Sequence, residues 1–285
     1  MPEGNRRIWL CADDYGISDS VNAAIRELIM RGRINATSVM VAAPHFDRGE
    51  AAALDMLNAK EKRAAIGLHV TLTAPFKPMS AEFAPLHHGA FPPLTKMMRV
   101  ALARRLNPER LAIEVASQVE GFIMAFGRLP DFIDGHQHVH LFPQVRDAVL
   151  KVAAEVAPNA WVRQCGRARA AVRLHLRKEL LLDVLSVAFR RKAKQLGVPT
   201  NPAFAGAYDF DGKPDFAALF PQFLAGLPDG GLIMCHPGVV DPALKRLDPL
   251  TDQREREYAY FNSEEFPRVL AEHGVALARP PADNV

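Results

Sequence analysis

Short apolar runs alternate with helical patterns along almost the whole of this 285-residue chain. The runs have the length and composition of buried strands, and turn-forming residues bound them. This alternation predicts a parallel sheet, because consecutive parallel strands need a crossover that is usually helical. We expect at least seven strands, near residues 8–12, 37–42, 65–70, 131–134, 161–165, 232–235 and 275–278.

At this length, an α/β pattern with about seven parallel strands favours a distorted (β/α) barrel of the TIM type. An open, doubly wound sheet is the alternative. We expect a single domain over residues 1–285, interrupted by a proline-rich loop at 74–93 and a basic helical insertion at about 166–196. A long loop after a barrel strand is suited to form a lid or a substrate wall, although a plain surface excursion would give the same pattern.

The clearest helix signal follows the proline-rich loop. Asn107 can cap the helix and Pro108 suits its first position, while Gly127 is a natural end. Between them, apolar residues recur at helical spacing. We therefore expect a helix from Pro108 to just before Gly127.

Composition excludes several classes of protein. The net charge of +3 gives no indication of a nucleic-acid partner. No apolar run approaches the ~18 residues that a membrane span needs. The first strand begins near Ile8, so we expect no signal peptide and a cytoplasmic location. Cys11, Cys165 and Cys235 lie in apolar runs and are expected to be small buried residues rather than a disulfide or zinc framework.

Basic residues gather in one part of the chain. Residues 163–194 contain ten Lys or Arg and two acidic residues, which leaves a net charge of +8. The centre of this segment, 180–189, is apolar. Such a helix could rest on an anionic membrane surface or a lipid-linked substrate, or it could be an ordinary helix packed on the barrel. The sequence leaves a homo-oligomer open.

Polar residues that can carry chemistry follow four of the expected strands. They form these groups: Asp13-Asp14, His69, the run from Asp134 to His140, and His236-Pro237-Gly238. In α/β barrels the carboxyl ends of the strands line the active-site mouth, so residues far apart in sequence can meet there. We therefore expect these groups to converge on one site.

The adjacent carboxylates of Asp13 and Asp14 need a reason to lie side by side, because like charges repel. A metal ion bound by Asp14, with Asp13 acting as a base, provides one. The alternative is that either residue caps the following helix. One carboxylate and two imidazoles form a facial ligand set with open positions, so we assign Asp14, His69 and His136 as ligands of one divalent ion.

The remaining polar candidates are less constrained. His138 and His140 are expected to support the ligands or touch the substrate, or else to be structural turn residues. His236 is the candidate acid that protonates a departing amine, although a turn histidine before Pro237 would look the same. Arg163 could orient Asp13 through a bidentate pair or contact the substrate, or it could simply belong to the basic segment.

Three spaced motifs together resemble those of the YdjC family of carbohydrate deacetylases. They are the Ala-Asp-Asp-Tyr-Gly start, the Gly-x-His-x-x-Leu-Thr segment and the Asp-x-His-x-His-x-His run. The resemblance covers Ala12 to about Pro143, then weakens until His236-Pro237-Gly238. The family includes a chitooligosaccharide deacetylase type and a hopanoid-associated HpnK type. The chain lacks the His-Ser/Thr-x-x-x-His helix pair of NodB-type enzymes, so the parallel with that group is indirect.

The resemblance implies a distorted (β/α) barrel with a divalent metal, Asp13 as general base, and Asp14, His69 and His136 as ligands. The implied activity is removal of acetyl groups from N-acetylated amino sugars, either soluble and chitobiose-like or lipid-linked. The family favours Mg²⁺, whereas two nitrogen ligands also suit Zn²⁺. The alternatives are another metal-dependent barrel hydrolase, such as a phosphoesterase or amidohydrolase, and a non-catalytic binding module that uses the basic segment at a membrane.

Overall fold

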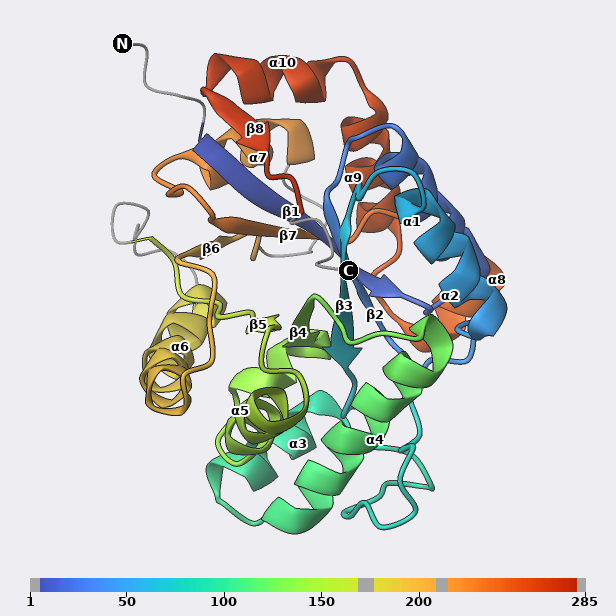
Figure 1. The fold of residues 1–285 in the computed structure, drawn as a ribbon, viewed down its shortest axis with the longest axis vertical. Helices are drawn as coiled ribbons and strands as arrows, with labels where there is room; N and C mark the ends of the chain where they lie inside the picture. Colours follow the sequence, from blue (N-terminus) through green and yellow to red (C-terminus); the bar gives the residue numbers. More distant parts are fainter. Residues whose placement is uncertain (1–5, 169–176, 209–214, 281–285) are drawn as a thin grey trace.

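A parallel β-sheet lies at the centre of the molecule, with helices around its outside (Figure 1). The computed structural model describes residues 6–168, 177–208 and 215–280. The strands within these residues are β1 (Arg6–Tyr15), β2 (Ala36–Val39), β3 (Ala65–Val70), β4 (Phe132–Gly135), β5 (Trp161–Val162), β6 (Phe204–Ala205), β7 (Leu232–Cys235) and β8 (Val275–Leu277).

The order of the strands is that of an incompletely closed barrel. Seven strands follow the path β5-β4-β3-β2-β1-β7-β6, and β8 pairs with the first residues of β1. All of these pairs are parallel. Where the two ends of the path approach each other, the Phe204 N–H donates to the Gly166 carbonyl at 3.0 Å. The predicted distorted TIM-like barrel is thus confirmed as a seven-stranded parallel half-barrel.

Helices connect the strands and cover the outside of the sheet (Figure 1). Those in the described residues are α1 (Asp19–Met30), α2 (Arg48–Asp55), α3 (Leu94–Leu102), α4 (Pro108–Phe126), α5 (Val145–Val156), α6 (Arg177–Leu196), α7 (Phe216–Leu224), α8 (Pro242–Leu247), α9 (Asp252–Asn262) and α10 (Glu265–Glu272). Two 3₁₀ segments, η1 (Met56–Asn58) and η2 (His136–Leu141), follow α2 and β4.

Local chemistry explains the boundaries of α4, which match the prediction. The Asn107 side chain accepts a hydrogen bond from the Arg110 N–H at 3.0 Å, which satisfies one of the unpaired donors of the first turn. Gly127 ends the helix with φ of 68°, a conformation that glycine adopts without a steric penalty. The buried face of α4, including Val115 and Phe122, packs into the core.

The core surrounds β1, which pairs with three strands, β2, β7 and β8. Ile8 and Leu10 on one face of the strand and Cys11 on the other are fully buried, as expected for a strand covered on both faces. The three cysteines are free and buried, which confirms that they are small core residues. The two-residue strand β6 was not predicted, because a run this short between Pro202 and Gly206 carries no periodicity.

The two segments that interrupt the alternation have different surroundings. In the proline-rich loop 74–93, Phe76 and Phe91 are buried, and the Phe76 ring meets the edge of His136 at a centroid distance of 5.7 Å. The loop thus contacts a predicted site residue through Phe76, and its role as a lid or a substrate wall stays a prediction. The basic insertion contributes α6, whereas residues 169–176 of it lie outside the described residues. The assignment of residues 1–285 to one domain stays a prediction.

Candidate active site

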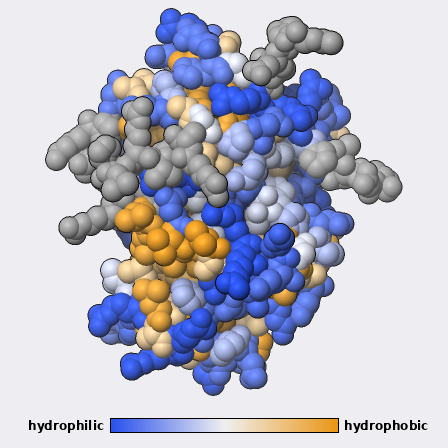
Figure 2. All heavy atoms as spheres, turned by 90° about the vertical axis from the view of Figure 1, so that its left-hand side faces the viewer, coloured by the Kyte–Doolittle hydropathy of each residue, from blue (hydrophilic) through white to orange (hydrophobic). Residues whose placement is uncertain are grey.

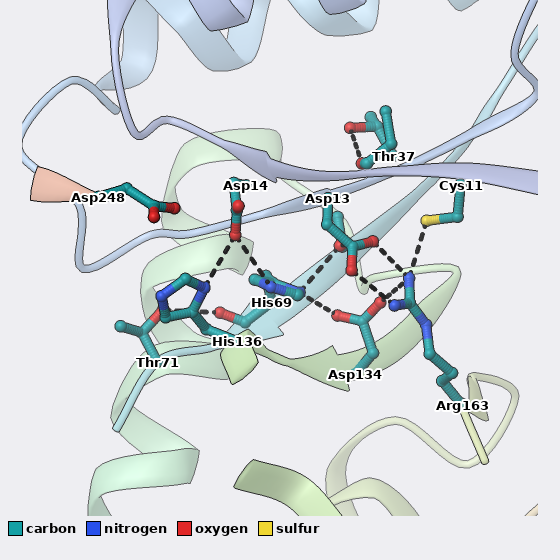
Figure 3. A network of polar contacts seen from close by, with 12 residues as sticks. Cys11, Asp13, Asp14, Thr37, His69, Thr71, Asp134, His136, Arg163 and Asp248 are labelled. Atoms are coloured by element: carbon teal, nitrogen blue, oxygen red, sulfur yellow. Dashed lines mark hydrogen bonds and ion pairs between the residues drawn. The ribbon is translucent and has the colours of Figure 1, made fainter. Parts of the chain in front are cut away.

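Side chains from β1, β3 and β4 meet at the carboxyl edge of the sheet, where β2 separates β1 from β3 (Figure 3). Asp13 and Asp14 come from the end of β1, His69 from β3 and Asp134 from β4. His69 and Asp134 are direct partners in the β3–β4 register. This pairing brings together residues 65 positions apart in the chain, as parallel-strand geometry predicts.

Asp14, His69 and His136 form a compact cluster of metal-ligand type. The Asp14 Oδ1 atom lies 2.9 Å from His136 Nδ1 and 3.3 Å from His69 Nε2. One candidate ligand atom from each residue lies within 4.8 Å of the other two, and all three residues are buried. The structure therefore brings together the three residues predicted as ligands. Their role as ligands stays a proposal.

His69 is held in one orientation by its other ring nitrogen. Its Nδ1 donates to Asp134 Oδ1 at 2.5 Å, and Ser38 Oγ lies 2.9 Å from the same nitrogen. Burial disfavours the charged ring, but Asp134 and Asp14 raise the pKa of His69 to about 10. A carboxylate on the distal nitrogen of a histidine is the usual support of a metal-bound imidazole, because it fixes the ring and leaves Nε2 to the metal.

The donor set of the cluster fits one divalent cation. A carboxylate oxygen and two imidazole nitrogens converge, and the Asp134 carboxylate holds the other ring nitrogen of His69. The second oxygen of Asp14, Oδ2, accepts a hydrogen bond from Arg254 at 2.6 Å. Asp14 would thus offer a metal a single oxygen. Three protein ligands leave coordination positions open, which is typical of a catalytic rather than a structural ion.

Cys11, Asp13 and Asp134 form a second group with ligand-like spacing, but an arginine already lies among them. Arg163, which follows β5, places its guanidinium 2.6 Å from Asp13 Oδ1, 2.5 Å from Asp134 Oδ2 and 3.1 Å from Cys11 Sγ. The arginine is fully buried. A bound metal would therefore compete with a fixed positive charge at this point.

Asp13 is paired to Arg163 in the bidentate manner suggested by the sequence. A second hydrogen bond joins Arg163 to Asp13 Oδ2 at 2.7 Å. Burial favours the neutral acid, but the guanidinium outweighs it and holds the pKa of Asp13 well below its usual range. Asp13 is therefore a carboxylate at neutral pH, fixed beside the candidate metal ligands.

A cavity of about 350 Å³ opens beside these residues. Its lining combines the carboxylates and imidazoles with apolar side chains: Asp13, Asp14, Leu94, His136, Gln137, His138, Met234, His236, Asp248, Pro249 and Leu250. The metal-ligand candidates Asp14 and His136 thus face the same space as the candidate base and the candidate acid. A ligand of the size of a sugar unit could reach all of them from this cavity.

His236 follows β7 and is held at its backbone. Its N–H donates to the Glu257 carboxylate at 2.5 Å, and the same carboxylate accepts from the Tyr208 hydroxyl at 2.5 Å. Burial, helped by the charge of Arg254, lowers the pKa of His236 to about 4. The ring is therefore neutral at neutral pH, and it must gain a proton before it can give one.

The three histidines after β4 have separate environments. His136 and His138 line the cavity, and His138 Nδ1 lies 3.5 Å from Cys165 Sγ. His140 is fully buried, and its Nε2 donates to the Arg163 carbonyl at 2.9 Å. His140 thus supports the backbone of the arginine that holds Asp13. Substrate contact by His138 stays a prediction, and the position of His140 favours a supporting role.

The backbone at the site is conformationally demanding. Asp14, Gln137 and His138 have φ of 68°, 53° and 58°, in the left-handed region. Such conformations cost about 1–3 kcal/mol each and persist only where the surroundings enforce them. They turn the chain at the shift of register near the end of β1 and directly after β4. The turns are what direct the side chains of Asp14, His136 and His138 into one cavity.

Sequence reasoning missed the contribution of the C-terminal helices. Arg254 and Glu257 lie three residues apart on α9, so they share its inner face. Both are fully buried, although the charged run around them is typical of a solvated helix. Asp248, which follows α8, accepts from Arg254 at 2.7 Å. Asp134 did carry a signal, since it closes an expected strand two residues before His136.

The chain belongs to the YdjC-like protein family, whose model matches residues 7–272. It is 29% identical over 261 residues to a chitooligosaccharide deacetylase of Citrobacter koseri, covering 86% of this chain and 91% of that protein. Its fold resembles a protein of Enterococcus faecalis V583 named for cellobiose-phosphate cleavage, with a TM-score of 0.75, 22% identity, and 97% and 98% of the chains covered. A peptidoglycan N-acetylglucosamine deacetylase gives a TM-score of 0.50 at 10% identity, over 97% and 87%.

Within the described ranges, none of the helices combines the length and the apolar character that crossing a bilayer requires.

Proposed function

We propose that this protein is a metal-dependent hydrolase that removes the acetyl group from an N-acetylated amino sugar. The observation that carries the proposal is the meeting of Asp14, His69 and His136 beside the ionised Asp13, at a cavity of about 350 Å³. The family and the related chitooligosaccharide deacetylase of Citrobacter koseri support the carbohydrate and the acetyl specificity.

A divalent cation held by Asp14, His69 and His136 would polarise the acetyl carbonyl and lower the pKa of a water molecule. The chemistry of the donor set suits Zn²⁺, while the resemblance favours Mg²⁺. Asp134 and Ser38 keep the Nε2 atom of His69 directed toward Asp14. The protein thus holds the ligands in place before any ion binds, which reduces the cost of ordering them.

Asp13 takes the proton of the attacking water. The charge of Arg163 makes this carboxylate a weak base, so the water must itself be acidified for the transfer to proceed. In return, Arg163 and Ser38 fix the carboxylate: both of its oxygens accept from the guanidinium, and Ser38 Oγ lies 3.3 Å from Oδ1. Asp13 is thereby positioned more strongly than an isolated carboxylate would be.

His236 is the proposed proton donor to the departing amine. It borders the cavity on the β7 side, and the Glu257 carboxylate fixes its backbone. Because the ring starts neutral, the proton that Asp13 takes from the water would have to be relayed to His236 before the ring passes it to the departing nitrogen. Leu94, Met234 and Leu250 supply apolar surface suited to the acetyl methyl group.

A phosphoester substrate is the competing possibility, and the name of the Enterococcus faecalis relative refers to cleavage of a sugar phosphate. A phosphate normally needs a cationic anchor. Among the described residues that line the cavity there is no Lys or Arg. The two nearby arginines, Arg163 and Arg254, already pair with buried carboxylates. These observations favour an amide over a phosphoester.

The test is a substrate and metal panel with the purified protein. The protein is treated with a chelator, reloaded separately with Zn²⁺, Mg²⁺, Mn²⁺ or Co²⁺, and assayed for acetate release from short chitooligosaccharides and N-acetylglucosaminyl glycolipids. Phosphate release from a phosphomonoester panel is measured in parallel. The proposal expects metal-dependent acetate release. Phosphate release without acetate release would refute it.

A further inference from the structure

The outward face of α6 is apolar over its first half. Leu180, Leu181, Val184 and Val187 are exposed by 57%, 40%, 61% and 60%. Residues 180, 184 and 187 follow helical spacing and lie along one stripe, which we call the outer stripe together with Leu181. The space-filling view of the side of the molecule that carries α6 shows a continuous hydrophobic patch there (Figure 2).

The outer stripe is not needed to attach α6 to the fold. The opposite face of the helix carries Leu182, Leu185 and Phe189, all of them buried in the core. A helix on a protein surface normally has one apolar face, directed to the core, and a polar face directed to water. A second apolar face gathered in one patch marks a surface that meets a partner.

Charges around the outer stripe indicate the nature of that partner. The helix carries six Lys or Arg and two acidic residues. Of the acids, Asp183 is engaged by Arg167, whose side chain lies 2.8 Å away. Exposed Arg191 and Lys194 continue the line of the stripe toward the end of the helix. An apolar stripe flanked by cations matches an anionic lipid surface, where tails accept the apolar residues and headgroups the charges.

A second copy of the chain fits this surface less well. Two copies meeting through the same stripe would bring together two basic helices, each with six Lys or Arg and two acidic residues, and like charges across an interface are unfavourable. The membrane has the opposite sign of charge. The charge pattern therefore favours an anionic membrane over a second copy of the chain as the partner of the outer stripe.

We propose that the outer stripe of α6 docks on an anionic lipid bilayer. Docking would bring the cavity close to the membrane, because α6 packs next to the residues that line the cavity. Ser186, on the inner face of the helix, accepts a hydrogen bond from the Cys165 N–H at 3.1 Å. Cys165 in turn contacts His138, which lines the cavity.

The test is sedimentation of the full-length protein with vesicles. One set contains phosphatidylcholine alone, and the other contains about one third phosphatidylglycerol. We expect binding to the anionic vesicles only, weakened by salt because the attraction is partly electrostatic. The double variant Val184→Ser/Val187→Ser, and separately Arg191→Glu/Lys194→Glu, should each lower binding about tenfold. Ile113→Ser/Met124→Ser on α4, which changes two exposed apolar residues elsewhere, is the matched control.

Melting curves of all variants check that each remains folded. Equal binding by the stripe variants and the control, or no binding of the wild type to anionic vesicles, would overturn the proposal. So would a concentration-dependent dimer in light scattering that Val184→Ser/Val187→Ser abolishes, because a second copy would then cover the stripe. None of these measurements depends on the activity of the enzyme.

Discussion

Arg254 donates to one carboxylate oxygen of Asp14 at 2.6 Å, while the other oxygen faces His136 at 2.9 Å. Burial alone would favour the neutral acid, but His136 and Arg254 hold the pKa of Asp14 well below its ordinary range. The arginine also pairs with Asp248. A residue 240 positions away along the chain thus keeps the proposed metal ligand ionised and restricts it to one free oxygen.

Replacing Arg254 with Met should destabilise the metal-free protein by about 3–5 kcal/mol, because it leaves a buried carboxylate without its cation. A bound metal ion would restore positive charge beside Asp14, so the loss should be smaller with metal. Urea denaturation with chelator and with added Zn²⁺ measures both values. Arg256→Met, at an exposed position of the same helix, is the control. The same loss under both conditions would contradict the link between Arg254 and the ligand.

Asp13→Asn should retain metal but lower kcat by about 10²–10⁴, because the amide cannot accept the water proton. The fold should persist, since Arg163 keeps its ion pair with Asp134. Metal content and acetate release from a chitooligosaccharide give the two readings. Asp229→Asn, at an exposed carboxylate that pairs with Arg7 near the start of β1, serves for comparison. Near-normal turnover by Asp13→Asn would remove Asp13 from the role of base.

Asp134→Asn should weaken metal binding by about 10–100-fold, because a neutral amide supports the His69 imidazole less strongly than a carboxylate does. Ser38→Ala removes the uncharged neighbour of the same nitrogen and should have a smaller effect. Calorimetric titration with Zn²⁺ compares the two. If both variants bind as tightly as the wild type, His69 does not depend on its outer partners.

Glu257 should make the protein less stable as the pH rises. Burial raises the pKa of Glu257 from 4.5 to about 7. Between these values the unfolded chain has lost the proton while the folded protein keeps it, so the free energy of unfolding falls with rising pH. The advantage of the wild type over Glu257→Gln should therefore be larger at about pH 5 than at about pH 8, by about 2–3 kcal/mol.

Urea denaturation of the wild type and Glu257→Gln across this range measures that difference. Glu255→Gln, which changes an exposed carboxylate on the same helix, should show no such trend. A pH-independent difference between the wild type and Glu257→Gln would mean that Glu257 titrates as an ordinary carboxyl.

Local signals account for the parts of the fold and site that could be predicted. The helix from Pro108 and the strand that carries His69 were visible because caps and apolar runs act over a few residues. Parallel topology then predicts that strand ends share one edge, which brings Asp14, His69 and His136 together. No further long-range information was needed for these residues.

Contacts that depend on how distant helices pack could not be predicted. Arg254 and Glu257 are buried only because α9 lies against the end of β1 and β7, and the charged sequence around them is typical of a surface helix. Arg163 was ambiguous for the same reason: its sequence neighbours are basic, and only the tertiary fold separates it from them. His140 faces inward through a backbone turn that its sequence spacing does not indicate.

The guanidinium of Arg163, which lies among Cys11, Asp13 and Asp134, is a permanent part of the chain. An ion bound at Asp14 and the two imidazoles would be exchangeable. A chelator can take away an ion from Asp14 and the imidazoles, but it cannot extract a covalently attached cation. Asp13, the proposed base, would therefore keep its counter-charge whether or not the proposed ion is bound. After loss of the ion, Arg163 would still hold the Asp13 carboxylate in position, and only the ion would have to be replaced.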